Sequence, residues 1–185
     1  MNKVFGGIAL GALVVAGLAA QSRQAPSTRG TTGTLPVPTA TAMLTDANGG
    51  SVGTARLQQT PHGVLMKLDL QDATPGVHAL HIHEAGRCEP PSFQSAGNHF
   101  EPSQRQHGFL NLDGPHAGDI PNIDVPPTRR LTVEHLLSGV TLDDGPRSLL
   151  HADGSAIIIH ADEDDYASDP SGNAGDRIAC GRIEG

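Results

Sequence analysis

Histidines with the spacing of metal ligands are concentrated in one stretch of the chain, from Gly76 to Asp119. Six of the ten histidines fall there, and a carboxylate ends the stretch. Histidine is the commonest metal ligand in proteins. The six are His78, His81, His83, His99, His107 and His116. We interpret this stretch as a histidine-rich metal site that lies partly on a strand and partly on a long loop.

The H-x-H pair His81 and His83 is the strongest local signal. Side chains two residues apart on a strand point to the same face, so both imidazoles can reach one metal ion. His78 is three residues from His81 and is expected to face the other side as a packed, hydrogen-bonded residue. His160 ends the apolar run AIIIH and can bring a third ligand from another strand, and His99 can be a fourth. A set made only of imidazoles suits copper(II).

A second ligand set follows along the chain. His107, His116 and Asp119 form a three-histidine, one-carboxylate set if they share one imidazole with the copper group, and that donor set suits tetrahedral zinc. Spacing alone does not show that an imidazole is shared. A lone histidine is more often a core or solvated residue than a ligand, and we treat His62, His135 and His151 as ordinary residues.

Short segments with partial alternation of apolar and polar residues surround this stretch. Such segments predict strands, and they cover residues 38–46, 51–60, 63–72, 76–84, 131–137, 155–161 and 177–183. The segment LTVEHLLSG is compatible with a strand or a short helix. Residues 85–125 lack periodicity and predict a long loop, which is uncommon in a compact domain unless the loop is functional. Many short strands and few helices indicate a β-sandwich or flattened barrel.

The N-terminal residues resemble an export signal. Lys3 precedes an uncharged, largely apolar run, which predicts a signal peptide over residues 1–20. A retained membrane anchor is the alternative, although the run is short for a full span. Residues 21–34 predict a flexible linker, and residues 35–185 a single domain. Export implies an oxidising compartment, in which Cys88 and Cys180 are expected to form a disulfide rather than two free thiols.

Five motifs in this order resemble the copper/zinc superoxide dismutases, especially the exported bacterial members. They are GVHALHIHEAG, SAGNHFEPSQRQHG, PHAGDIPNI, IIIHADEDDY and GNAGDRIACG, and the resemblance spans residues 35–185. It implies an all-β fold, an eight-stranded Greek-key β-barrel with long metal-binding and active-site loops. It also implies one copper ion and one zinc ion per chain.

The resemblance also implies a role for each site residue. His81, His83, His99 and His160 match the copper ligands, and His99, His107, His116 and Asp119 match the zinc ligands. His99 matches the shared imidazolate, which is expected to carry a proton during turnover. Asp164 matches the aspartate that links a copper histidine to a zinc histidine. Arg177 matches the arginine that positions the anionic substrate, and Cys88 and Cys180 match the family disulfide.

The function implied is dismutation of superoxide to dioxygen and hydrogen peroxide, an antioxidant defence outside the cytoplasm. The expected location is exported, in the periplasm, the cell envelope or the extracellular space. A copper-binding or copper-delivery protein without turnover is the alternative. The net charge of −8 argues against a nucleic-acid partner. Membrane association is expected only if the signal is retained, and a homodimer is left open.

Overall fold

The computed structural model describes residues 1–3, 6 and 37–185. Residues 34–185 form one compact unit, which carries all the strands described below. Apart from residues 1–3 and 6, the predicted signal peptide and linker lie outside the described residues. Within the part of the chain that the structure describes, no helix is both long and apolar enough to cross a membrane.

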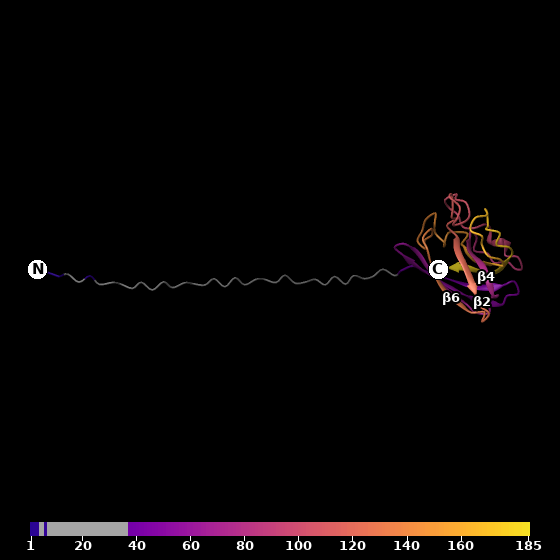
Figure 1. Cartoon of the computed structure of the whole chain (residues 1–185), viewed down its shortest axis with the longest axis horizontal. Coiled ribbons are helices and arrows are strands. Elements are labelled where there is room, and N and C mark those ends of the chain that lie inside the picture. Colours follow the sequence, from indigo (N-terminus) through magenta and orange to yellow (C-terminus); the bar gives the residue numbers. More distant parts are fainter. Residues whose placement is uncertain (4–5, 7–36) are drawn as a thin grey trace. The chain divides into compact units, whose positions relative to one another are not determined.

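Eight strands form one antiparallel, nearly closed barrel (Figure 1). They are β1 (Thr39–Asp46), β2 (Ser51–Thr60), β3 (Gly63–Leu70), β4 (Gly76–His83), β5 (Asp119–Val125), β6 (Leu131–Leu137), β7 (Ala156–His160) and β8 (Arg177–Glu184). Their spatial order is β5-β4-β7-β8-β1-β2-β3-β6, so β3 pairs with β6 while β4 lies between β5 and β7. These crossing connections are those of a Greek key. The predicted all-β, eight-stranded fold is confirmed.

The alternation in the sequence determines which side chains fill the barrel. In β3, Val64, Met66, Leu68 and Leu70 are all buried, whereas the residues between them are exposed or half-buried. Leu80 and Ile82 of β4, and Ile157 and Ile159 of β7, join the same core. Because aromatic residues are scarce, aliphatic side chains fill almost all of this interior.

One segment, β5, differs from the prediction made from the sequence, and another, β6, resolves a segment that the prediction left open. Strand β5 lies inside the stretch 85–125 that was predicted to be a loop, and this part of the prediction was wrong. Its sequence DIPNIDV carries Pro121 and Asn122 between the buried residues Ile120 and Ile123, which hides the period of two. Strand β6 resolves the ambiguous LTVEHLL segment, because its exposure alternates along the whole length and it pairs with β3 throughout.

A small second apolar cluster lies outside the barrel and anchors the loop after β4. Phe93 and Ala96 of this loop pack on Ala156, Ile158 and Cys180 of β7 and β8. Cys88 of the same loop is bonded to Cys180, so the predicted disulfide is confirmed. The loop contains the short 3-10 helix η1 (Gln94–Ala96) and is held against the barrel wall at several points.

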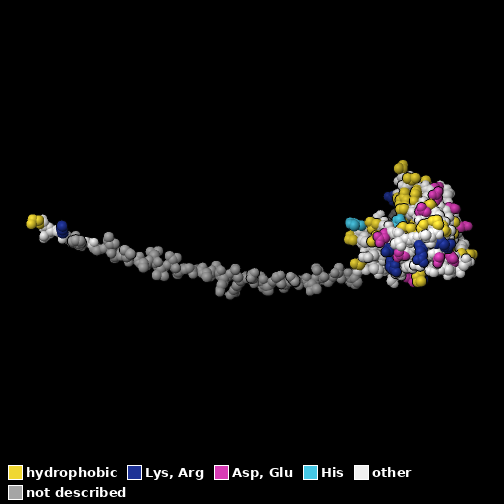
Figure 2. All heavy atoms as spheres, turned by 60° about the horizontal axis from the view of Figure 1, so that its bottom comes forward, with side chains coloured by type: hydrophobic (Ala, Val, Ile, Leu, Met, Phe, Trp, Pro, Cys, Tyr) yellow, Lys and Arg dark blue, Asp and Glu magenta, His cyan; other side chains and the backbone are white. Residues whose placement is uncertain are grey.

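Charged groups of both signs share the surface of this β-domain. On the face shown in Figure 2, Lys and Arg side chains gather toward the lower part of the domain, with Asp and Glu beside them. The excess of acidic over basic residues in the chain therefore does not make the whole surface negative, and an anion can meet local positive charge.

Candidate metal centre

Strand β4 carries two of its three histidines, His81 and His83, on the outside of the barrel. Leu80 and Ile82 point into the core, so His81 and His83 face the opposite way, under the long loops. Antiparallel pairing places β7 beside β4, with His81 opposite Ile158. His160 ends β7, and its ring centre lies 5.0 Å from that of His81 and 5.6 Å from that of His83.

Four imidazole nitrogens, one from each residue of the predicted copper set, converge on one buried point. His81, His83, His99 and His160 each offer a ligand atom within 4.8 Å of the others, and all four are buried. One ring nitrogen of each lacks a hydrogen-bond partner among the described residues: His81 Nδ1, His83 Nε2, His99 Nε2 and His160 Nε2. Buried polar atoms are rarely left unpaired, so this set fits a bound metal ion with four imidazole donors.

The second nitrogen of these rings is held by a fixed acceptor. His83 Nδ1 lies 3.0 Å from the Gly97 carbonyl oxygen, and His160 Nδ1 lies 3.3 Å from that of Gly175. Such contacts set the tautomer and aim the free nitrogen at the metal. The Gly97 and Gly175 carbonyls had no signal in the sequence, because any residue type provides a backbone carbonyl.

His99 connects the two predicted sets through its two ring nitrogens. Its Nε2 belongs to the copper-facing group, whereas its Nδ1 lies 3.0 Å from Asp119 Oδ1. Its ring centre is 4.1 Å from that of His81 and 5.4 Å from that of His116. An imidazolate that bridges two metal ions needs this arrangement, with one nitrogen on each side.

Three Nδ1 atoms surround Asp119 Oδ1 in the other half. The distances are 3.0 Å from His99, 3.0 Å from His107 and 3.5 Å from His116. Ligand atoms at the corners of a zinc tetrahedron are roughly 3.3 Å apart, because Zn–N and Zn–O bonds are about 2.0–2.1 Å. The donor set therefore fits zinc. Asp119 Oδ2 accepts hydrogen bonds from the backbone N–H groups of Gly108 and His116, which fix the carboxylate.

His116 lies slightly apart from the other three residues of the predicted zinc set. The second compact group of ligand atoms contains His81, His99, His107 and Asp119, and His116 approaches it through a 3.4 Å contact with His99 Nδ1. Its side chain is 11% exposed, while those of His107 and Asp119 are 0% exposed. His116 therefore forms the solvent-facing side of this half.

Asp164 lies between the two halves. Its Oδ2 is 2.9 Å from His81 Nε2, and its Oδ1 is 3.0 Å from His107 Nε2. One carboxylate thus contacts a ring from each set and orients both. His78 lies on the other side of β4, as expected, with Nδ1 2.8 Å from the His160 carbonyl oxygen and Nε2 3.0 Å from that of Thr74.

Arg177 begins β8 directly beside His160 in the sheet register. Its guanidinium donates to the carbonyl oxygens of Phe93 and Gly97, at 2.8 and 2.7 Å. Three of its five N–H groups are not needed for these bonds, and its charge lowers the pKa values of His83 and His160 in addition to the larger effect of burial. A cation beside the predicted copper set can attract and orient a small anion.

Burial dominates the proton affinities in the metal-free site. Burial lowers the pKa of His99 to about 4 and that of His160 to about 3, and it lowers the pKa of His83 further. His107 differs, because hydrogen bonds to Asp119 and Asp164 outweigh burial and raise its pKa to about 9. The pKa of Asp119 is strongly lowered: burial opposes this, but three histidines outweigh it. Neutral, unprotonated imidazoles are the form that binds metal.

These shifts predict that the metal-free protein loses stability in acid. In the unfolded chain, His83, His99 and His160 bind protons below their ordinary pKa of 6.5, whereas in the folded site they bind protons only near pH 4 and below. The free energy of unfolding therefore falls as the pH is lowered from 6.5 toward 4. The raised pKa of His107 has the opposite effect on the pH dependence of stability, but it is one group against three. Urea unfolding of the metal-free protein should therefore show a lower midpoint at pH 5 than at pH 7. An unchanged or higher midpoint at pH 5 would contradict this assignment.

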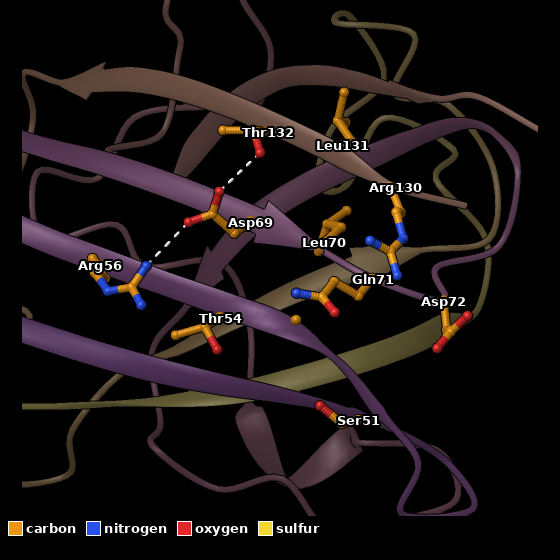
Figure 3. Close-up of a pocket in the computed structure, with 11 residues that line it drawn as sticks. Ser51, Thr54, Arg56, Asp69, Leu70, Gln71, Asp72, Arg130, Leu131 and Thr132 are labelled. Carbon is orange, nitrogen blue, oxygen red and sulfur yellow. Dashed lines mark hydrogen bonds and ion pairs between the residues drawn. The ribbon is translucent and has the colours of Figure 1, made fainter. Parts of the chain in front are cut away.

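A separate groove lies on the outer face of β2, β3 and β6. It has a volume of about 540 Å³. Arg56 and Thr132 both bond to Asp69 along its wall, and Gln71 and Arg130 point into the same space (Figure 3). None of the residues that line it belongs to the histidine cluster. His135 also lies outside the cluster, although its buried Nε2 has no partner among the described residues.

Comparison with known proteins agrees with this geometry. Residues 51–183 match the copper/zinc superoxide dismutase family. Cu-Zn superoxide dismutase 1 of Aquifex aeolicus is 47% identical over 145 residues, which cover 77% of this chain and 86% of that protein. The Cu-Zn superoxide dismutase of Caulobacter vibrioides is 43% identical over 148 residues, or 78% and 85% of the two chains.

Solved structures lead to the same family. A double mutant of a superoxide dismutase-like protein from Bacillus subtilis has a TM-score of 0.76 and 38% identity, and the match covers 78% of this chain and 97% of that one. The Cu/Zn superoxide dismutase of Brucella abortus has a TM-score of 0.66 at 24% identity, which supports the fold; the match covers 80% of this chain and 100% of that one. This chain therefore belongs to the copper/zinc superoxide dismutase family, whose copper- and zinc-dependent activity is the dismutation of superoxide.

Proposed function

We propose that His81, His83, His99 and His160 hold copper and that His99, His107, His116 and Asp119 hold zinc, with Arg177 and His99 as the catalytic residues. The observation that carries this assignment is the set of four buried ring nitrogens without partners, one from each residue of the copper set. The three Nδ1 atoms around Asp119 Oδ1 support the zinc assignment.

Each residue then has a defined task in the dismutation of superoxide. When bound, copper supplies the one-electron redox chemistry that converts one superoxide to dioxygen and the next to hydrogen peroxide, while zinc supplies a fixed positive charge. Arg177 attracts the anion and orients it beside the copper-facing nitrogens. His99 holds a proton at Nε2 and gives it to the peroxide product, and water supplies the second proton that hydrogen peroxide requires. Asp164 keeps the rings of His81 and His107 in place.

Selective loss of each metal tests the assignment. His83→Ala should bind zinc but lose most of its copper, because His83 contacts the copper-facing group alone. His116→Ala should bind copper but lose most of its zinc. Metal content per chain, measured after loading with both ions and extensive dialysis, separates the two outcomes. Loss of zinc in His83→Ala together with unchanged copper would show that the two sets are wrongly assigned.

Arg177 provides a test of substrate attraction. Arg177→Ala should lower kcat/KM for superoxide by at least about 10-fold, because local positive charge raises the rate at which an anion reaches its site. Copper and zinc contents should stay unchanged. Arg177→Lys should recover part of the loss at low ionic strength, and a lysine variant as slow as the alanine variant would contradict a role for charge.

Export is the proposed location, and it rests on the sequence of residues 1–20 and on the disulfide, which persists in oxidising compartments. We further propose cleavage of residues 1–20, a linker over residues 21–34 and a homodimer as the assembly to test. N-terminal sequencing of the mature protein and sedimentation equilibrium check these points. An uncleaved N-terminus in the membrane fraction would favour the retained anchor.

A further inference from the structure

Asp164 is not a proposed metal ligand, yet several hydrogen bonds hold its backbone and its carboxylate in place. Its carboxylate touches His81 and His107, so a small rotation of Asp164 would misalign one ring of each metal set. Asp164 lies on the long loop between β7 and β8, and loops hold side chains less firmly than strands do. The contacts that fix this loop residue therefore decide how well the two halves are aligned.

Asn122 pairs with both backbone polar groups of Asp164. Its Nδ2 donates to the Asp164 carbonyl oxygen, and its Oδ1 accepts from the Asp164 N–H, each at 2.9 Å. Two parallel hydrogen bonds to one residue fix its position and its rotation. Asn122 lies on β5, the strand that begins with Asp119. Strand β5 thus carries Asp119 itself and, through Asn122, also holds Asp164 in position.

Tyr166 makes three further bonds around the same point. Its backbone N–H donates to Asp164 Oδ1 at 2.6 Å. Its carbonyl accepts from the N–H of Leu110, at 2.9 Å, in the loop between His99 and Asp119, which we call the zinc loop. Its phenol oxygen accepts from the backbone N–H of Asn122 at 2.7 Å. Its φ is +61°, which is rare for a bulky residue. Such a conformation persists only where the surroundings over-determine it, typically at functional sites.

Gly172 closes the remaining side of the carboxylate. Its φ is +64°, and a Cβ added there would overlap Asp164 Oδ1 and lie 2.7 Å from His107 Nε2. The loop therefore packs its backbone directly against the contact between Asp164 and His107. Asp164 has no room to adopt another rotamer on this side, so the contacts with Asn122 and Tyr166 act on a carboxylate that is already confined.

We propose that Asn122 and Tyr166 are positioning residues that clamp Asp164 between the two metal sets and thereby control how firmly zinc is retained. The clamp joins β5, the zinc loop and the loop between β7 and β8 at one point. It acts through Asp164, because neither side chain offers an atom to the histidine cluster. The inference rests on the metal assignment proposed above.

The rate of zinc release into a chromogenic chelator tests the clamp. Asn122→Ala should release zinc about 10-fold faster than the unaltered protein, the lower end of the effect seen when groups that orient metal ligands are removed. Tyr166→Phe, which removes only the phenol contact, should show a smaller increase. Asn122→Asp keeps the acceptor for the Asp164 N–H and should lie between Asn122→Ala and the unaltered protein.

Asn173→Gly is the matched control in the same loop. It removes an amide that bonds to Asp165 and Ser168 but not to Asp164, and glycine tolerates the positive φ of this position. Its release rate should stay within about twofold of the unaltered protein, since the site does not contact Asp164. The copper EPR spectrum should change in Asn122→Ala, because His81 turns, and should not change in Asn173→Gly.

A double-mutant cycle separates positioning from a general structural role. In an Asp164→Asn background, Asn122→Ala should accelerate zinc release by less than about twofold, since residues that act through one partner are not additive. Equal release rates for Asn122→Ala and Asn173→Gly would overturn the clamp, and so would an undiminished effect in the Asp164→Asn background. These comparisons use proteins that bind zinc; failure to bind zinc at all would instead overturn the metal assignment.

Discussion

His160→Ala should abolish superoxide dismutation while leaving zinc in place. His160 is the one residue of the proposed copper set that lies on β7, and its Nε2 is one of four convergent nitrogens without partners among the described residues. Its removal would leave three imidazoles in the proposed copper set, so copper should be lost on dialysis. The rate of superoxide decay should fall by at least about 100-fold, since even groups that only orient metal ligands are worth up to that factor.

His62→Ala is the control for this variant. His62 is an exposed histidine in the turn between β2 and β3, and its ring makes no contact with the cluster. Its activity and its copper content should equal those of the unaltered protein. If His160→Ala kept full copper and full activity, the four-imidazole site would be wrong, and the search for the copper ligands would return to the remaining histidines.

Removal of the disulfide should be the largest single loss of stability. Cys88 and Cys180 are 92 residues apart, so the bond closes a long loop in the unfolded chain. The chain-entropy model gives about 4–5 kcal/mol for a loop of this length. Cys88→Ser and Cys180→Ser should each lower the free energy of unfolding by this amount, measured by guanidinium titration of the metal-free protein.

Reduction of the unaltered protein is the matched comparison for these variants. The reduced protein should unfold at nearly the same denaturant concentration as the Cys88→Ser and Cys180→Ser variants. The loop that carries Cys88 also supplies the Phe93 and Gly97 carbonyls that hold Arg177, so loss of the disulfide should also loosen the position of Arg177. A loss of less than about 1 kcal/mol would show that packing, rather than the disulfide, keeps this loop in place.

The strand histidines could be placed from the sequence because a period of two is a local property. His81 and His83 follow from alternation within β4, and the disulfide follows from a count of two cysteines in a chain that is expected to be exported. Strand β5 was hidden because Pro121 and Asn122 interrupt its apolar pattern. In β6, His135 occupies a core-facing position, and this histidine in the alternation made a strand and a helix equally plausible.

The supporting contacts could not be read from the sequence because they join distant segments. Tyr166 and Asn122 are 44 residues apart, and Gly97 and Arg177 are 80 residues apart. Several of these contacts use backbone carbonyl or N–H groups, which leave no trace in residue type. The side chain of Asn122 holds the loop that carries Asp164 through two such backbone groups.

The most direct test of the central claim combines metal analysis with a superoxide-decay assay on the mature protein. After loading with both metals, we expect about one copper and one zinc per chain, as the two donor sets require, and rapid decay of superoxide. Removal of copper alone should abolish the decay, and its return should restore it. Full copper and zinc without any acceleration of superoxide decay would contradict dismutation at this site and favour a copper-binding protein without turnover.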